Sequence, residues 1–204
     1  MAPLAQHHHQ DIRLIAESLG SSDCKKLFYL CERFETDSSV TSVMELLKSK
    51  VEEHGNYPSY LLELMWHLER FDIIKRVFKV SRNEVEQTLK YRQVLSKFRV
   101  LMTNVSEEVV KEDLEQIKFL LGGQLSREKI KTAKGFLDVL IELEKQDLVS
   151  PERVDFVMKC FTDIGRLDLA KKVAAYKTSG HQTRPTPSHR HKECGITCMQ
   201  RAEN

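Results

Sequence analysis

The chain has 204 residues, of which 41% are hydrophobic and 30% charged, a balance typical of a globular protein with enough apolar side chains for two small cores. Eight glycines and five prolines are too few for the turns of an all-β fold, and the apolar runs are too short for a membrane span or a signal peptide. The formal net charge of +2 belongs to residues 178–204, where four basic residues stand against two acidic ones, so residues 1–177 are formally neutral. We therefore expect no nucleic-acid binding and no membrane insertion, and a cytoplasmic protein with reduced cysteines.

Apolar residues recur at helical spacing through the first half of the chain. Helices are expected over residues 12–19, 22–31, 43–54, 58–68 and 70–77. Ser81 is a good cap for a more polar helix that would link the two halves. We expect residues 1–9 to be an N-terminal extension and 81–92 to be the linker helix.

The second half repeats this scheme. Helices are expected over residues 94–105, 114–121, 136–143, 151–164 and from 166 onward, with a basic connection at 127–134. From residue 178 the chain is rich in Pro, Ser, His and Arg, and we expect residues 178–204 to be disordered. The predicted fold is all-α, with six-helix bundles over residues 10–80 and 93–177.

A short motif marks the duplication most clearly. It reads Arg70-Phe71-Asp72-Ile73 in the first half and Arg166-Leu167-Asp168-Leu169 in the second. An acidic residue, Asp23 or Asp113, opens a helix upstream of each motif. The copies are offset by 90 residues at the acid and by 96 at the arginine, so the second copy has six additional residues in between. A period near 90 residues is too long for a solenoid repeat and is typical of a duplicated small domain.

Two aromatic–aliphatic pairs occupy the same place in each copy, Tyr29-Leu30 and Phe119-Leu120. Aromatic and leucine side chains on a helix usually belong to the core. Neighbouring residues on a helix point about 100° apart, however, so both members of a pair cannot lie at the centre of one buried stripe.

Catalytic and metal-binding signatures are weak. Cys24, Cys31 and Cys160 follow helical patterns and are expected to be buried thiols. A second group, consisting of Cys194, Cys198, His189 and His191, would allow a zinc site, but its C-x3-C and H-x-H spacing lacks the supporting fold of a known zinc finger. We expect no cofactor and no enzymatic activity, and a duplicated helical module favours binding over catalysis.

Together, the six helices per copy, the acid that opens the second helix, the aromatic pair on it and the Arg-x-Asp motif resemble the death effector domain. Two such domains in series, over residues 10–177, resemble the prodomains of initiator caspases and the FLICE-like inhibitory proteins (FLIPs). The resemblance is strongest to cellular FLIP in the second copy, at Arg99-Val100-Leu101-Met102, Ser126-Arg127-Glu128-Lys129-Ile130 and Phe136-Leu137-Asp138. It implies a short or viral-type form that lacks the caspase-like domain.

The resemblance also implies roles for single residues. Arg70 would bridge Asp23 and Asp72, and Arg166 would bridge Asp113 and Asp168, through charge-assisted bonds of the guanidinium. Residues two apart on a helix do not face each other, so this pairing requires the arginine at the helix start. The other implied sites are partner contacts at Phe119, Leu120 and Arg13, and contacts between the domains at Tyr29 and Leu30.

The implied partners are a FADD-type adaptor and initiator procaspases. A hydrophobic knob at Phe119 would enter a groove formed by the first and fourth helices of another death effector domain. Such head-to-tail contacts do not close and extend into filaments. The implied function is inhibition of caspase activation in death-receptor signalling. Two alternatives stay open: a scaffold that activates NF-κB signalling through a kinase complex, and a caspase prodomain that promotes assembly.

Overall fold

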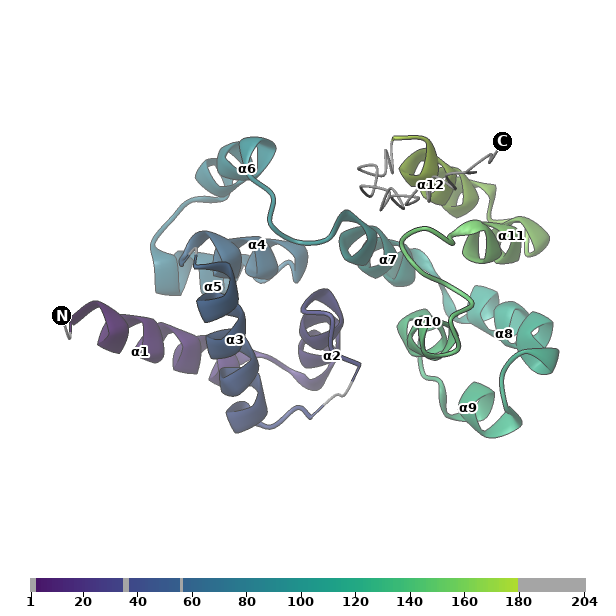
Figure 1. The fold of residues 1–204 in the computed structure, drawn as a ribbon, viewed down its shortest axis with the longest axis horizontal. Coiled ribbons are helices and arrows are strands. Elements are labelled where there is room, and N and C mark those ends of the chain that lie inside the picture. Colours follow the sequence, from purple (N-terminus) through teal and green to yellow (C-terminus); the bar gives the residue numbers. More distant parts are fainter. Residues whose placement is uncertain (1–2, 35–36, 56, 180–204) are drawn as a thin grey trace, which may run out of the picture.

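The computed structural model describes residues 3–34, 37–55 and 57–179, and these residues form an all-α molecule (Figure 1). The helices of the first half are α1 (Pro3–Ser18), α2 (Ser21–Leu30), α3 (Val40–His54), α4 (Ser59–His67), α5 (Phe71–Ile73), a π-helix (Ile74–Phe78) and α6 (Arg82–Tyr91). Those of the second half are α7 (Lys97–Glu108), α8 (Lys111–Leu120), a 3-10 turn (Leu121–Gly123), α9 (Arg127–Thr132), α10 (Phe136–Lys145), α11 (Asp155–Asp163) and α12 (Leu167–Thr178).

Local sequence signals set several helix ends. Ser39 caps α3 by accepting a hydrogen bond from the Ser42 backbone N–H, and Gly55 ends the same helix in the left-handed conformation, with φ 59°. At α6, Ser81 and Glu84 form a reciprocal capping box. These caps satisfy backbone groups that the helix itself leaves unpaired.

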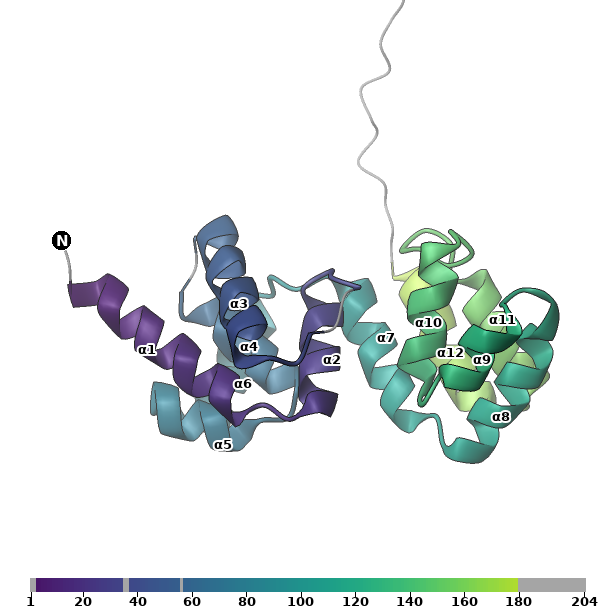
Figure 2. The ribbon, with the colours of Figure 1, turned by 90° about the horizontal axis from the view of Figure 1, so that it is seen from below.

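Two helical bundles lie beside each other along the long axis of the molecule, as Figure 2 shows. Each bundle has its own apolar core. The first core collects buried side chains from residue 12 to residue 95, and the second collects those from residue 98 to residue 173. Helix α2 of the first bundle contacts α7 of the second. Tyr29 of α2 is grouped with the second core, so the two bundles share a packed interface. The predicted all-α fold with two tandem bundles is confirmed.

The connection between the second and third long helices holds the six additional residues of the second copy. Helices α2 and α8 end at Leu30 and Leu120, an offset of 90 residues. Helices α3 and α10 begin at Val40 and Phe136, an offset of 96. Helix α9 lies in the longer connection of the second copy, and no counterpart of α9 is formed by the described residues between α2 and α3.

The linker helix α6 packs back onto the first bundle. Its apolar residues Val85 and Leu89 are buried against α4. The carboxylate of Glu63, on α4, is itself buried and accepts hydrogen bonds from the backbone N–H of Val94 at 2.7 Å and of Leu95 at 3.1 Å. Burial raises the pKa of Glu63, and the two hydrogen bonds oppose this rise. The chain segment that connects the two bundles is therefore held against the core of the first bundle.

The last helix differs between the two copies. In the second copy α12 is a regular helix of 12 residues, whereas in the first copy α5 passes after one turn into the π-helix Ile74–Phe78. Lys79, which follows the π-helix, is left-handed, with φ 56°. Within the described part of the chain, no helix is long and apolar enough to cross a membrane.

Candidate functional site

In the first copy, the Arg70 guanidinium joins three helix ends. Its Nε and Nη2 donate to the two carboxylate oxygens of Asp72 at 2.9 and 2.8 Å, a bidentate pair. Its Nη1 donates to Oδ2 of Asp23 and to the backbone carbonyl of Ser18, both at 2.8 Å. Asp23 also accepts from the Gly20 backbone N–H at 3.2 Å, which caps α2. The network ties the end of α1 to the starts of α2 and α5.

The second copy repeats these contacts. Arg166 donates from Nε and Nη2 to Asp168 at 3.0 and 2.8 Å, and its Nη1 donates to Asp113 and, at 3.1 Å, to the backbone carbonyl of Glu108. Asp113 accepts from the Val110 backbone N–H at 3.3 Å and so caps α8. The end of α7 is thereby tied to the starts of α8 and α12.

Both arginines occupy the position just before the helix, with φ and ψ of −86° and 61° at Arg70 and −80° and 65° at Arg166. This backbone lies outside the helical region, so the side chain can turn back toward an aspartate two residues later. Each arginine side chain is about three-quarters buried. The structure thus brings together both sets of three charged residues, and the geometry favours a role in orienting helices.

The arginines hold the outer aspartates in their charged form. Hydrogen bonding to Arg70 lowers the pKa of Asp72 from 3.8 to about 2, and hydrogen bonding to Arg166 does the same for Asp168. A carboxylate with a depressed pKa in the folded state stabilises that state above its ordinary pKa. This contribution is lost as the pH falls through the folded value.

We therefore expect the free energy of unfolding to decrease between about pH 4 and pH 2 as Asp72 and Asp168 become protonated. The double variant Asp72→Asn and Asp168→Asn should be less stable than wild type at neutral pH, and its stability should change less over this window. Urea unfolding followed at several pH values measures both quantities. A matched control, Glu45→Gln with Glu128→Gln, changes two exposed carboxylates that bond to neither arginine. Equal pH dependence in wild type and both double variants would contradict the prediction.

Tyr29 and Phe119 are equivalent in sequence and opposite in exposure. Tyr29 is fully buried, whereas the Phe119 side chain is 87% exposed. Both lie near the C-terminal end of the second helix of their bundle, so the helix itself does not explain the difference. The second bundle covers Tyr29, and no described part of the chain covers Phe119 in the same way.

The polar groups around Tyr29 form an interdomain cluster, which we define as Tyr29, Arg99 and Glu144. The Tyr29 hydroxyl donates to Oε1 of Glu144 at 2.6 Å, and Arg99 donates to the same oxygen at 2.9 Å. The Arg99 guanidinium lies 4.5 Å from the centre of the Tyr29 ring. Burial raises the pKa values of Tyr29 and Glu144, while Arg99 opposes both shifts. All three side chains are largely removed from water, and each of them contacts the other two.

Two ion pairs also connect α2 with the second bundle. Lys25 donates to Asp138 at 2.5 Å, and Lys26 pairs with Glu107. Both lysines belong to α2, and both acids belong to the second bundle. Sequence reasoning did not find these contacts, because the partners are more than 80 positions apart and carry no shared motif.

The remaining predicted residues lie as follows. The contact of Leu30 with the second domain stays a prediction, and the structure groups its buried side chain with the core of the first bundle. This follows from the helix geometry, because Leu30 points about 100° away from Tyr29. Leu120 is partly exposed beside Phe119. Arg13 is exposed on α1 and donates to Glu17 at 2.7 Å.

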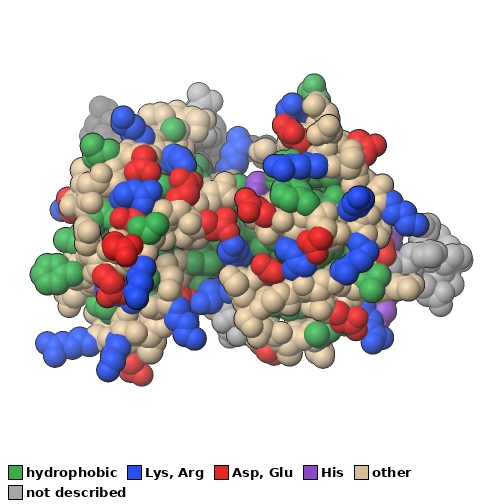
Figure 3. Space-filling model, turned by 180° about the vertical axis from the view of Figure 1, so that it is seen from behind, with side chains coloured by type: hydrophobic (Ala, Val, Ile, Leu, Met, Phe, Trp, Pro, Cys, Tyr) green, Lys and Arg blue, Asp and Glu red, His purple; other side chains and the backbone are tan. Residues whose placement is uncertain are grey.

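A shallow apolar hollow adjoins Phe119, between α8 and α11, with a volume of about 390 Å³. Its lining includes Leu120, Ile164 and Phe119 together with the acidic residues Glu115 and Asp163. Glu115 is paired with Lys118 at 3.1 Å. Figure 3 shows an apolar side chain that projects from the outer edge of the second bundle, with acidic side chains near it. An exposed aromatic side chain beside an apolar hollow is typical of a protein-interaction surface.

The described cysteines are buried thiols. Burial raises the pKa of Cys31 and of Cys160 to about 11, which disfavours the reactive thiolate. No group of three or more possible metal ligands occurs among the described residues. Cys194, Cys198, His189 and His191 lie outside the described residues, as does most of the predicted disordered segment.

Comparison with known proteins agrees with this geometry. The death effector domain family matches residues 98–179. The crystal structure of the viral FLIP MC159 superimposes with a TM-score of 0.70 and 25% sequence identity, over 83% of this chain and 89% of that one. The chain is a tandem death effector domain protein related to the cellular and viral FLIPs.

Two relatives show how far the similarity extends. The mouse "CASP8 and FADD-like apoptosis regulator" is 30% identical over 174 residues, which cover 85% of this chain and 36% of that protein. The "Viral CASP8 and FADD-like apoptosis regulator" of molluscum contagiosum virus subtype 1 is 27% identical over 169 residues, covering 81% of this chain and 68% of that protein. The chain spans little more than a third of the mouse regulator, and the matched region consists of death effector domains.

Proposed function

We propose that the chain is a non-catalytic, cytoplasmic regulator that inhibits caspase activation in death-receptor apoptosis. It binds a FADD-type adaptor and initiator procaspases through death effector domain contacts. The observation that carries this proposal is the difference between two equivalent positions: Tyr29 is fully buried against the second bundle, and Phe119 is 87% exposed. The tandem unit thus uses one aromatic side chain internally and leaves the other available to a partner.

The names of the related proteins support the proposed role in apoptosis. Two of them are named as apoptosis regulators, and the structure of MC159 is described in terms of DISC assembly and inhibition by a viral FLIP. A chain that joins a procaspase assembly without bringing a protease of its own would leave a caspase without a partner for dimerisation. Inhibition then depends on the ratio of this chain to procaspase and on their relative affinities.

The domain division fits this role. We propose death effector domains over residues 10–80 and 93–177, with the linker helix at 81–92, an N-terminal extension at 1–9 and a tail at 178–204. Residues 3–9 of this extension continue the first helix of the bundle, because α1 begins at Pro3. The interdomain cluster and the Glu63 contacts to the backbone of Val94 and Leu95 support a rigid unit. Within that unit Arg13, at the opposite end from Phe119, is a second candidate partner contact.

Direct binding separates this proposal from the scaffold alternative. Purified chain is titrated against the adaptor's death effector domain, the tandem prodomain of an initiator procaspase, and the regulatory subunit of the NF-κB kinase complex. We expect saturable binding to the first two, and weaker binding when Arg13→Ala or Phe119→Ala is used. Binding to the kinase subunit without adaptor, together with no binding to adaptor or procaspase, would contradict the proposal in favour of the scaffold.

A further inference from the structure

A hollow on the first bundle lies between the π-helix and the start of α6, with a volume of about 570 Å³. Its apolar walls are formed by Phe71, Ile74 and Val80. Ile74 is fully buried in the first core, and the half-buried Phe71 and Val80 pack against that core. The inner side of the hollow therefore borders the packed interior of the bundle.

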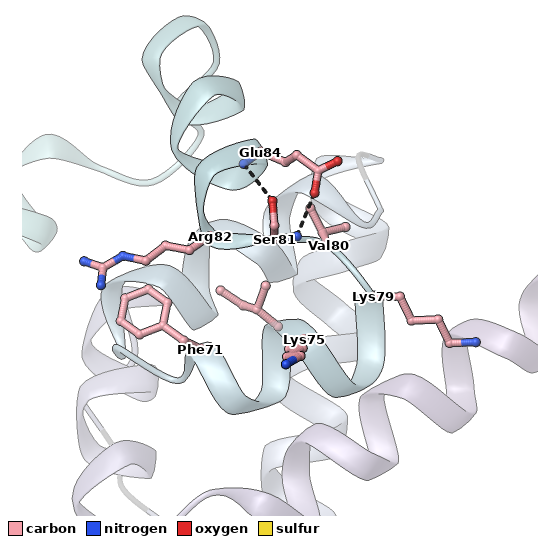
Figure 4. Close-up of a pocket in the computed structure, with 8 residues that line it drawn as sticks. Phe71, Lys75, Lys79, Val80, Ser81, Arg82 and Glu84 are labelled. Carbon is pink, nitrogen blue, oxygen red and sulfur yellow. Dashed lines mark hydrogen bonds between the residues drawn. The ribbon is translucent and has the colours of Figure 1, made fainter.

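Three basic side chains surround this hollow. Figure 4 shows Arg82 beside the Phe71 ring at one side and Lys79 at the other, and Lys75 lies between them on the π-helix. Lys75 and Lys79 are exposed, and neither forms an ion pair within the described part of the chain. The Arg82 guanidinium lies 4.4 Å from the centre of the Phe71 ring and 5.6 Å from that of Trp66, so its contacts are with aromatic rings.

The acidic side chains near the hollow are bonded to other groups. Glu84, which also lines it, accepts a hydrogen bond from the Ser81 backbone N–H at 2.7 Å in the capping box of α6. Asp72 accepts two hydrogen bonds from Arg70. The capping box already satisfies the start of α6, so the positive charge of the site comes from side chains. Three cations against one carboxylate in the lining leave a site that attracts an anion.

An apolar hollow edged by cations fits a ligand with an apolar body and an anionic end. A carboxylate at its mouth can accept charge-assisted hydrogen bonds from Lys75 and Lys79, because lysine side chains are flexible enough to turn toward it. Pockets for small molecules usually have volumes of about 300–1,000 Å³. All the residues that line the hollow lie between positions 71 and 84, whereas a protein partner usually contacts about 20–30 residues on each side. The size of the site therefore favours a small molecule.

We propose that this hollow binds a small amphipathic carboxylate. The apolar part of the ligand packs against Phe71, Ile74 and Val80, and its carboxylate is held by Lys75 and Lys79. The bound ligand contacts both the π-helix and α6, so it holds the linker helix against the first bundle. In the described part of the second bundle no helix follows α12, so the same two-sided hollow is not formed there.

Calorimetric titration of the full-length chain with decanoate tests the site, with decan-1-ol as an uncharged probe of the same chain length. The wild type should bind one decanoate, and binding should raise the melting temperature. With Lys75→Gln and Lys79→Gln together, decanoate affinity should fall ~10-fold or more while decanol affinity stays the same, because only the carboxylate loses its donors. Val80→Asp puts a charge in the apolar wall and should abolish binding of both probes. Lys131→Gln with Lys171→Gln, an equal charge change at exposed sites, is the control.

Trp66 gives a second measurement, because the centre of its ring lies 5.3 Å from that of Phe71 in the wall of the hollow. Decanoate should change the fluorescence of this single tryptophan in the wild type and in the control. Each variant is compared with the wild type by circular dichroism without ligand, so that loss of binding is separated from loss of folding.

Three outcomes would overturn the proposal. The first is the absence of saturable decanoate binding, or equal decanoate affinity in the wild type and the Lys75 and Lys79 variant. The second is loss of binding with Phe119→Asp but not with Val80→Asp, which would place the ligand at the other bundle. The third is binding of an acidic peptide with a central leucine but not of decanoate, which would assign the hollow to a protein partner. None of these measurements uses adaptor or procaspase, so the proposed function is tested separately.

Discussion

Replacing Glu144 with alanine is expected to lower the free energy of unfolding by about 3–5 kcal/mol, the usual cost of leaving a buried charge unpaired. Glu144 accepts hydrogen bonds from the Tyr29 hydroxyl and from Arg99, and the Arg99 side chain is only 10% exposed. Removing the carboxylate leaves the guanidinium without its partner inside the interface. The loss should therefore far exceed that of a surface ion pair, which contributes about 0–1 kcal/mol.

Urea unfolding followed by two signals measures this effect. The single tryptophan, Trp66, reports on the first bundle, and far-ultraviolet circular dichroism reports on both. The control Glu86→Ala removes the acid of an exposed pair with Lys90 and should change stability by less than about 1 kcal/mol. Replacing the whole pair by Arg99→Met with Glu144→Leu should recover part of the stability, because no buried charge is then left alone. A cost for Glu144→Ala as small as that of the control would contradict the interface described here.

Replacing Phe119 with alanine is expected to weaken partner binding by about 10- to 100-fold, since burying one large apolar side chain contributes about 1.5–3 kcal/mol. Thermal stability should stay within about 0.5 kcal/mol of wild type, because an exposed side chain contributes little to the core. Tyr91→Ala is a matched control, since the Tyr91 side chain is 89% exposed and lies on the linker helix. Equal binding by wild type and Phe119→Ala, or an equal loss with Tyr91→Ala, would show that Phe119 is not a specific contact.

Much of the fold follows from local patterns in the sequence. Helical spacing of apolar residues predicts each long helix, because one buried face recurs every three to four positions. The pairing of an arginine with an aspartate two residues later requires a non-helical arginine, and both Arg70 and Arg166 adopt that backbone. The offset between the copies places the additional residues before α10. These features depend on neighbours close in sequence.

Contacts between the bundles could not be predicted from local sequence patterns. Tyr29 and Phe119 occupy equivalent positions, and only the presence of the second bundle decides that Tyr29 is buried. Its partners Arg99 and Glu144 are distant in sequence, and no spacing pattern connects them with Tyr29. Glu63, in an otherwise apolar helix, gives no sign that it binds the backbone of the linker. The end of α5 in a π-helix was also unexpected, although the sequence resembles that of the regular α12.

Caspase activation in a reconstituted adaptor–procaspase assembly shows whether this chain inhibits the caspase through Phe119. The initial rate of procaspase processing is measured while wild-type chain, Phe119→Ala and Tyr91→Ala are each titrated in. We expect dose-dependent inhibition by wild type and Tyr91→Ala, with Phe119→Ala requiring about 10- to 100-fold more protein for the same effect. Accelerated processing at every dose of wild type, or equal inhibition by Phe119→Ala, would contradict this expectation.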